Sequence, residues 1–199
     1  IPAPYSIYDG IWKLNPGCIL KISLKNREPE ILRYWSAAKI ASRGVSNTLT
    51  GSPNDLISEF ETILKDSIRQ QMISDVPLGA FLSGGLDSST IVSLMQAQSN
   101  IPVKTFTIGF EEKAYNEADH AKAVAKHLGT DHTELYVSPQ EAMSVIPELP
   151  TIYDEPFSDS SQIPTFLVSK LARQHVTVSL SGDAGDELFC GYNRYMLTD

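Results

Sequence analysis

From residue 52 onward the sequence predicts an α/β fold, a parallel sheet with helices on both faces. Two observations predict it. Short β-rich runs alternate with amphipathic segments of helical length, and capping or turn residues separate them. In such sheets ligands bind beyond the carboxyl ends of the strands, so the residues that follow each strand are the first candidates for a site.

The first helix of this region is expected to start at Ser52. Ser52 can cap it, with Pro53 at its first position and Asp55 in its first turn. Apolar residues then recur at helical spacing as far as Met72. The apolar run at 78–82 is typical of a buried strand.

The remaining elements follow by the same reasoning from capping residues and from apolar or β-branched runs. Strands are expected at 103–109, 132–137 and 176–180, and helices at 116–128, from 138 onward and at 164–173.

The first 51 residues differ in character from the rest. Residues 1–35 predict a β segment, with an extended run at 5–8, a turn at 15–17 and an alternating strand at 18–24. Small polar residues at 36–51 indicate a linker or surface loop. We therefore expect a β segment (1–35), a linker (36–51) and an α/β domain (52–199).

Bulk composition limits the class of protein. Hydrophobic residues make up 42% and charged residues 20%, and the net charge of −8 argues against nonspecific nucleic-acid binding. No apolar run approaches the ~20 residues of a membrane span, and no secretory leader is visible. Cys18 and Cys190 are expected to be free thiols in a reducing compartment, the cytoplasm. Because the chain starts at Ile1 and not at Met, we expect a piece of a longer protein.

The run Ser83-Gly-Gly-Leu-Asp-Ser-Ser89 lies between a predicted strand and a predicted helix. Glycines there let backbone N–H groups approach an anion, and the helix start favours negative charge. No lysine of the Walker type is present. Asp87 would repel a polyphosphate unless a cation lay between them, which indicates Mg²⁺. The alternative is an ordinary Gly-rich turn with Asp87 as a helix cap.

A second Ser-Gly turn leaves the last predicted strand. Asp183 and Asp186 follow it, with Glu187 beside the second. An acid-rich helix start is the simpler explanation. Placed beyond a parallel strand, however, Asp186 can share one Mg²⁺ with Asp87. We expect four segments to converge on one crevice, namely the loop at 83–89, the strand end at 109–111, the loop at 154–161 and the turn at 181–183.

These motifs resemble known ones. Residues 83–89 are similar to the pyrophosphate-binding loop of the ATP pyrophosphatases, which have an adenine nucleotide alpha hydrolase-like fold. Together with Leu180–Tyr192, they resemble the synthetase domain of the glutamine-hydrolysing asparagine synthetases. The stretches 105–110, 115–121 and 153–161 look like the same family, and 2–8 and 14–17 resemble the end of its glutaminase domain.

The resemblance implies a role for each matching residue. Asp87 and Asp186 would bind Mg²⁺, and Asp183 would help handle ammonia, although well-studied relatives have Glu there. Ala184 and Cys190 replace frequent glycines, and only local backbone variation is expected from this. The adenosine would contact Phe81 and Ile108, and Ser181 and Gly182 would also touch the nucleotide. The pyrophosphate portion of ATP would contact Ser83, Gly84, Gly85, Asp87, Ser88 and Ser89.

The implied reaction is the ATP-dependent conversion of aspartate to asparagine through β-aspartyl-AMP, with ammonia from glutamine. The implied partners are these small molecules, without nucleic acid or membrane, and a homodimer of the full-length enzyme. The family's N-terminal cysteine and later lysine have no counterpart in this chain. We therefore expect the chain to bind nucleotide at best, without hydrolysing glutamine.

Two other classes stay open. One is a related adenylating ligase that closes a β-lactam ring or amidates a sugar or peptide carboxylate. The other is a binding module that keeps the fold without turnover.

Overall fold

The computed structural model describes residues 1–25, 27–110, 116–193 and 195. The chain divides into two compact units. The first contains Ile1–Leu56 and Leu149–Ser158, and the second contains Ile57–Glu148 and Asp159–Asp199. Each unit is described by itself.

The second unit holds the predicted parallel sheet. Its strands are β3 (Leu78–Phe81), β4 (Lys104–Phe110), β5 (Asp131–Val137) and β6 (Val178–Leu180), in the order β5-β4-β3-β6. All three strand pairs are parallel. The strands expected at 78–82, 103–109, 132–137 and 176–180 are thus confirmed, each within two residues of its observed bounds.

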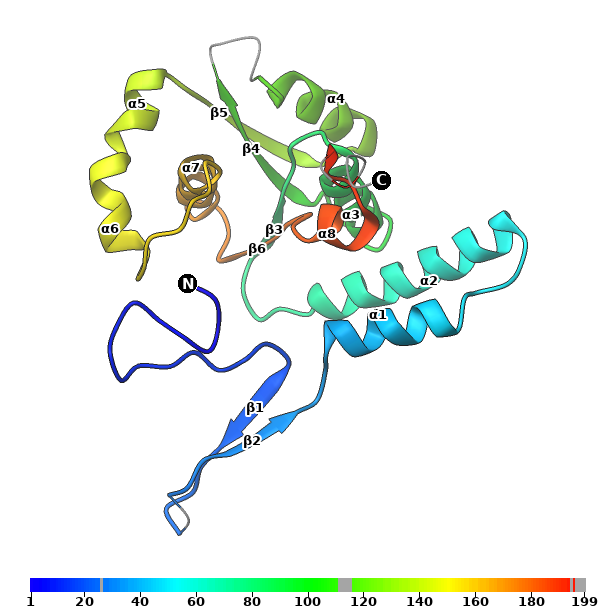
Figure 1. Cartoon of the computed structure of the whole chain (residues 1–199). Coiled ribbons are helices and arrows are strands. Elements are labelled where there is room, and N and C mark those ends of the chain that lie inside the picture. The colour runs from blue at the N-terminus through cyan, green and yellow to red at the C-terminus, as the bar shows by residue number, and fades with distance from the viewer. Residues whose placement is uncertain (26, 111–115, 194, 196–199) are drawn as a thin grey trace. The chain divides into compact units, whose positions relative to one another are not determined.

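Helices cover both faces of this sheet (Figure 1). Ala80 and Leu82 of the β3 segment pack with helices α3 (Leu86–Gln96) and α4 (Ala118–Leu128). Phe106 of β4 packs on the other face with α7 (Gln162–Ala172). Successive side chains alternate between the faces, and partners in a parallel pair point the same way. The register Ala80↔Thr105 and Phe81↔Phe106 therefore assigns each strand residue to one face.

Local sequence accounts for the helix ends. Gly129 ends α4 in the left-handed conformation at φ 72°. Ser138 and Glu141 form a complete capping box at the start of α5 (Pro139–Ser144). A 3₁₀ turn (Ile146–Glu148) follows. Helix α2 (Pro53–Gln71) begins as expected after Ser52, and α7 begins two residues before the expected Pro164.

The first unit departs from expectation in four respects. The run 5–8 forms no strand, and the strand from Cys18 ends at Lys21 (β1). It pairs antiparallel with β2 (Glu30–Arg33), which was not predicted. Residues Ala37–Ser46 of the expected linker form helix α1. The Ser36 side chain accepts a hydrogen bond from the Lys39 N–H, and the alanines that follow favour helix.

Residues 149–158 belong with the N-terminal segment, which the sequence did not indicate. They include the short helix α6 (Leu149–Ile152). Lys13 forms an ion pair with Glu155, and the Tyr8 hydroxyl donates to the Asp154 carbonyl at 3.4 Å. Within the described residues, no helix combines the length and the apolar character that crossing a membrane requires.

Candidate functional site

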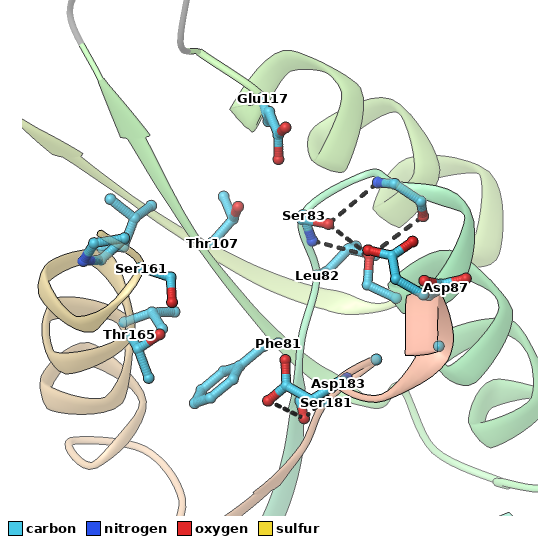
Figure 2. A pocket seen from close by; sticks show the side chains of 18 of the residues that line it. Phe81, Leu82, Ser83, Asp87, Thr107, Glu117, Ser161, Thr165, Ser181 and Asp183 are labelled. Carbon is cyan, nitrogen blue, oxygen red and sulfur yellow. Dashed lines mark hydrogen bonds between the residues drawn. The ribbon is translucent and has the colours of Figure 1, made fainter. Parts of the chain in front are cut away.

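A cavity of about 1000 Å³ opens at the carboxyl ends of β3, β4 and β6, within the second unit. Figure 2 shows residues of the loop after β3, of β4, of α7 and of the turn after β6 around it. Three of the four segments expected to converge line the cavity, with Ser83 and residues 85–88 of the first, Phe110 of the second and residues 181–183 of the third. The fourth contributes Ser160 and Ser161. Glu111 lies outside the described residues.

Hydrogen bonds between two serines close the loop after β3. The Ser83 N–H donates to Ser88 Oγ at 3.2 Å, and the two hydroxyls lie 2.9 Å apart. The Gly85 N–H donates to Ser83 Oγ, and Ser88 Oγ contacts the Gly85 carbonyl at 3.3 Å. Ser88 is buried, with 8% of its surface exposed. These bonds, drawn in Figure 2, make Ser88 the centre of the loop.

The loop packs tightly against the first turn of α4. Gly84 has φ 81°, and a Cβ there would lie 2.6 Å from the Ala121 nitrogen. Gly85 is the N-cap of α3, without a side-chain cap bond, and Asp87 is the second residue of the helix. The helix-cap explanation of Asp87 is therefore wrong. Its carboxylate is available to the cavity that it lines.

The turn after β6 packs directly on this loop. A Cβ at Gly182 would lie 2.8 Å from the Ser88 nitrogen, and one at Gly185 would lie 2.5 Å from Asp87 Cγ. Glycine is therefore the residue that fits at both places. This close approach brings Asp87 to the segment that carries Asp183 and Asp186, and all three line one cavity.

Two non-glycine residues in the second turn have left-handed backbones. Ala184 precedes the short helix α8 (Gly185–Phe189) at φ 73°, and Cys190 follows it at φ 58°. Both residues adopt the backbone conformation that glycine favours, although each carries a side chain. A side chain there costs roughly 1–2 kcal/mol.

Asp183 is held by its own turn. The Ser181 hydroxyl donates to Asp183 Oδ2 at 2.9 Å, and the Asp183 N–H contacts Ser181 Oγ at 3.4 Å. The start of α7 is fixed in a related way, since the Asp159 carboxylate accepts the Ser161 N–H at 2.8 Å. That bond, with one from the Ser161 hydroxyl, lowers the pKa of Asp159.

The structure divides the predicted site residues into two groups. Ten line the cavity: Phe81, Ser83, Gly85, Asp87, Ser88, Ile108, Ser181, Gly182, Asp183 and Asp186. Gly84 supports the loop from behind. Ser89 lines a separate groove between α3 and α4, and its enclosed hydroxyl has no partner among the described residues. Its expected contact with pyrophosphate is not supported by this position.

Other lining residues were missed. Thr107 of β4 and Glu117, which precedes α4, also line the cavity. Phe106, Phe110 and Phe189 add aromatic surface to it. Helix α7 contributes Pro164, Thr165 and Val168, and its N-cap residue Ser161 also lines the cavity. Alternation along 103–109 could have found Thr107, but no sequence pattern places α7 against this cavity. Tyr115 and Arg194 lie outside the described residues, and Tyr195 is exposed and stacks on Tyr192.

The cavity wall is acidic. Asp87, Glu117, Asp183 and Asp186 line it, and none of its described lining residues is basic. Across the described ranges, no three His, Cys, Asp or Glu side chains form a ready-made metal cluster. Cys18 and Cys190 are both free, as expected.

Taken together, fold and cavity define a parallel α/β domain with a glycine-containing strand-to-helix loop at the carboxyl edge of its sheet. The chain belongs to the asparagine synthase family, whose sequence pattern matches residues 59–198.

Named relatives are similar over most of the chain. A Methanocaldococcus jannaschii protein, provisionally named asparagine synthetase (glutamine-hydrolyzing) 2, is 41% identical over 98% of this chain and 37% of its own length. Asparagine synthetase (glutamine-hydrolyzing) 1 of Bacillus subtilis is 44% identical over 70% of this chain and 22% of its own. The chain thus spans little more than a third of these relatives at most.

Among solved structures, the NH3-dependent NAD synthetase of Campylobacter jejuni, in complex with the nitrate ion, is 16% identical. The likeness covers 68% of this chain and 60% of that chain, with a TM-score of 0.47.

Proposed function

We propose that the protein containing this chain is an ATP-dependent amide ligase that makes asparagine from aspartate and ammonia. One observation carries the proposal: Gly182 and Gly185 allow the second turn to lie against Ser88 and Asp87. A phosphate-type loop and a carboxylate-bearing turn thereby form one site. Similarity to relatives named asparagine synthetase supports the choice of reaction.

The proposed reaction has two steps. An oxygen of the aspartate side-chain carboxylate attacks the α-phosphorus of ATP, and the bond to pyrophosphate breaks. Ammonia then attacks the acyl carbon of β-aspartyl-AMP, AMP leaves, and a proton is lost. This chain's contribution is to position the reactants and to stabilise charge on the leaving pyrophosphate.

Backbone N–H groups of the loop and of the first turn of α3 would bind the pyrophosphate. The first helical bond of α3 runs from the Ser89 N–H to the Gly85 carbonyl, so the N–H groups before Ser89 precede the helical ladder. Phe81 and Ile108 line the cavity at the strand ends and would contact the adenosine. Asp183, fixed by Ser181, would accept a hydrogen bond from the incoming ammonia.

The lining residues also fit Mg²⁺. Mg²⁺ is held in nucleotide sites by one or two carboxylates together with phosphate and water oxygens, so a cluster of three acids is unnecessary. Asp87 and Asp186 would supply the carboxylates, and the missing side chain at Gly185 leaves the room that the Asp87 carboxylate occupies. The described residues that line the cavity include no basic side chain. The ion would therefore supply the positive charge that neutralises the polyphosphate.

Two alternatives to aspartate ligation use the same nucleotide site. A related ligase acting on another carboxylate would use the same ATP half, and a binding module would use it without turnover. For the full-length protein we also propose that glutamine supplies the ammonia, that the protein forms a homodimer, and that it is located in the cytoplasm.

Exchange of labelled pyrophosphate into ATP tests the proposal. The full-length protein, with Mg²⁺ and one carboxylic acid at a time, should catalyse exchange that depends on aspartate. Exchange dependent on a different acid would replace aspartate as the acceptor. No exchange with any acid, together with intact binding of Mg-ATP, would favour the binding module.

A further inference from the structure

Thr107 carries a buried hydroxyl that neither turn uses. It lies on β4, is 4% exposed and lines the cavity. Within the part of the chain that the structure describes, its hydroxyl makes no hydrogen bond. Three side-chain atoms there are both enclosed and unpartnered, those of Ser89, His132 and Glu155. The Thr107 oxygen is not one of them, so it stays open to the cavity.

Thr105, two residues earlier on the same strand and face, provides a contrast. It is fully buried, and its hydroxyl lies 3.0 Å from the Thr130 hydroxyl and 2.9 Å from His132 Nδ1. Buried hydroxyls are normally satisfied in this way, because an unmade hydrogen bond costs free energy. Thr107 is thus the exception on this face of β4, and its hydroxyl points toward a ligand space.

The register shows which part of a ligand Thr107 faces. Phe81 pairs with Phe106, and the Leu82 N–H donates to the Phe106 carbonyl. Continuing the register by one residue places Leu82 beside Thr107, with both side chains on the same face of the sheet. Leu82 packs with α3 and α4, the helices that hold the Ser83–Ser88 loop. Phe81 and Phe106 point to the α7 face. Thr107 therefore lies on the phosphate-loop side of the sheet, away from the apolar α7 side.

We propose that the Thr107 hydroxyl binds the nucleotide itself, donating a hydrogen bond to a phosphoryl oxygen. This inference rests on the proposed function, since it takes ATP as the ligand. Figure 2 shows Thr107 across the cavity from Ser83, and the carboxylate of Glu117, which lines the same cavity, points toward the space between them. A carboxylate there repels bare phosphate, so the ligand should bind as its magnesium complex.

The test is calorimetric titration of the full-length protein with magnesium pyrophosphate and with magnesium α,β-methylene-ATP. Thr107→Val keeps the shape and removes the hydroxyl, and it should weaken binding of the ATP analogue about tenfold. The melting temperature should stay unchanged or rise, because no internal bond is lost. Thr107→Ser should restore the affinity.

Thr105→Val is the matched control. It also removes a buried hydroxyl from β4 but breaks an internal network, so it should lower the melting temperature and leave the affinity within about twofold. If Thr107→Val fails to fold, Thr107→Ala gives the same comparison.

Equal affinity of wild type and the folded Thr107 variant would overturn the inference while leaving the proposed function standing. So would equal losses of affinity in the Thr105 and Thr107 variants. A wild-type protein that binds neither magnesium complex would overturn both proposals.

Discussion

The two turns that meet at the cavity reach tight backbone conformations by different means. The loop after β3 has glycine at its left-handed position, Gly84, and is stabilised by a hydrogen bond between the Ser83 and Ser88 hydroxyls. The turn after β6 has left-handed residues with side chains, Ala184 and Cys190. The difference teaches that the second turn's shape is kept at an energetic cost, as expected of a backbone that holds functional groups in place.

The largest effect should come from filling the contact between the turns. Gly182→Ala would place its Cβ 2.8 Å from the Ser88 backbone nitrogen, which cannot move aside alone. We expect a loss of about 1–3 kcal/mol in the free energy of unfolding, and weaker Mg-nucleotide binding. Thermal melting and titration with magnesium α,β-methylene-ATP measure the two effects.

Gly44→Ala in α1 is the control for that substitution, because a Cβ there would meet nothing within 4 Å. It should stabilise by roughly 0.5–1 kcal/mol. A Gly182→Ala protein as stable and as tightly binding as wild type would show that the turns do not form one site.

Two adjacent serines sharpen the comparison within the first turn. Ser88→Ala removes a buried hydroxyl that contacts both Ser83 and Gly85, at a cost of about 1–3 kcal/mol and with loss of nucleotide affinity. Ser89→Ala removes an enclosed hydroxyl without a described partner and should be neutral or stabilising. Melting curves and nucleotide titrations of both variants measure these effects. A larger loss of stability and affinity in Ser89→Ala than in Ser88→Ala would contradict the described loop.

The second turn should gain stability from glycine. Ala184→Gly and Cys190→Gly relieve left-handed strain, and each should stabilise by about 0.5–1 kcal/mol after the entropic cost of glycine. Ala97→Gly is the control, since Ala97 has an ordinary right-handed conformation at φ −63° and should lose stability. Destabilisation by both turn substitutions would show that these backbones are not strained.

The smallest effect concerns pH and lies away from both turns. Burial lowers the pKa of His132 below its usual 6.5, against the attraction of Glu134 and with the repulsion of Lys122. The unfolded chain therefore takes up a proton first, and stability falls as pH drops below about 6.5. Between pH 7.5 and 5.5, the melting temperature of wild type should fall more than that of His132→Gln. Equal decreases in the melting temperatures of the two proteins would contradict the proposed contribution of His132.

Sequence reasoning worked where one residue determines a local conformation. Ser52, Ser138 and Gly129 marked helix ends, and apolar alternation marked the strands. The rule that ligands bind beyond parallel strand ends was enough to gather Asp87 and Asp186 into one cavity.

It failed where the orientation of a side chain or its hydrogen-bond partner decides, and in one segment where a local helix signal was misread. Ser89 looks equivalent to Ser88 in the sequence, but helical geometry turns it into the groove between α3 and α4. Thr107 resembles any strand threonine until its lack of a partner is seen. The helix at 37–46 was missed because its alanines were taken as small linker residues, although alanine is the best helix former.

The most direct test of the shared site is a double-mutant cycle on Asp87 and Asp186. Affinity for magnesium α,β-methylene-ATP is measured for the full-length wild type, Asp87→Asn, Asp186→Asn and the double variant. If both carboxylates hold one Mg²⁺, each single substitution should weaken binding by about 100-fold, and the double should be little worse than either. Losses that simply add, or no loss from either substitution, would contradict the account.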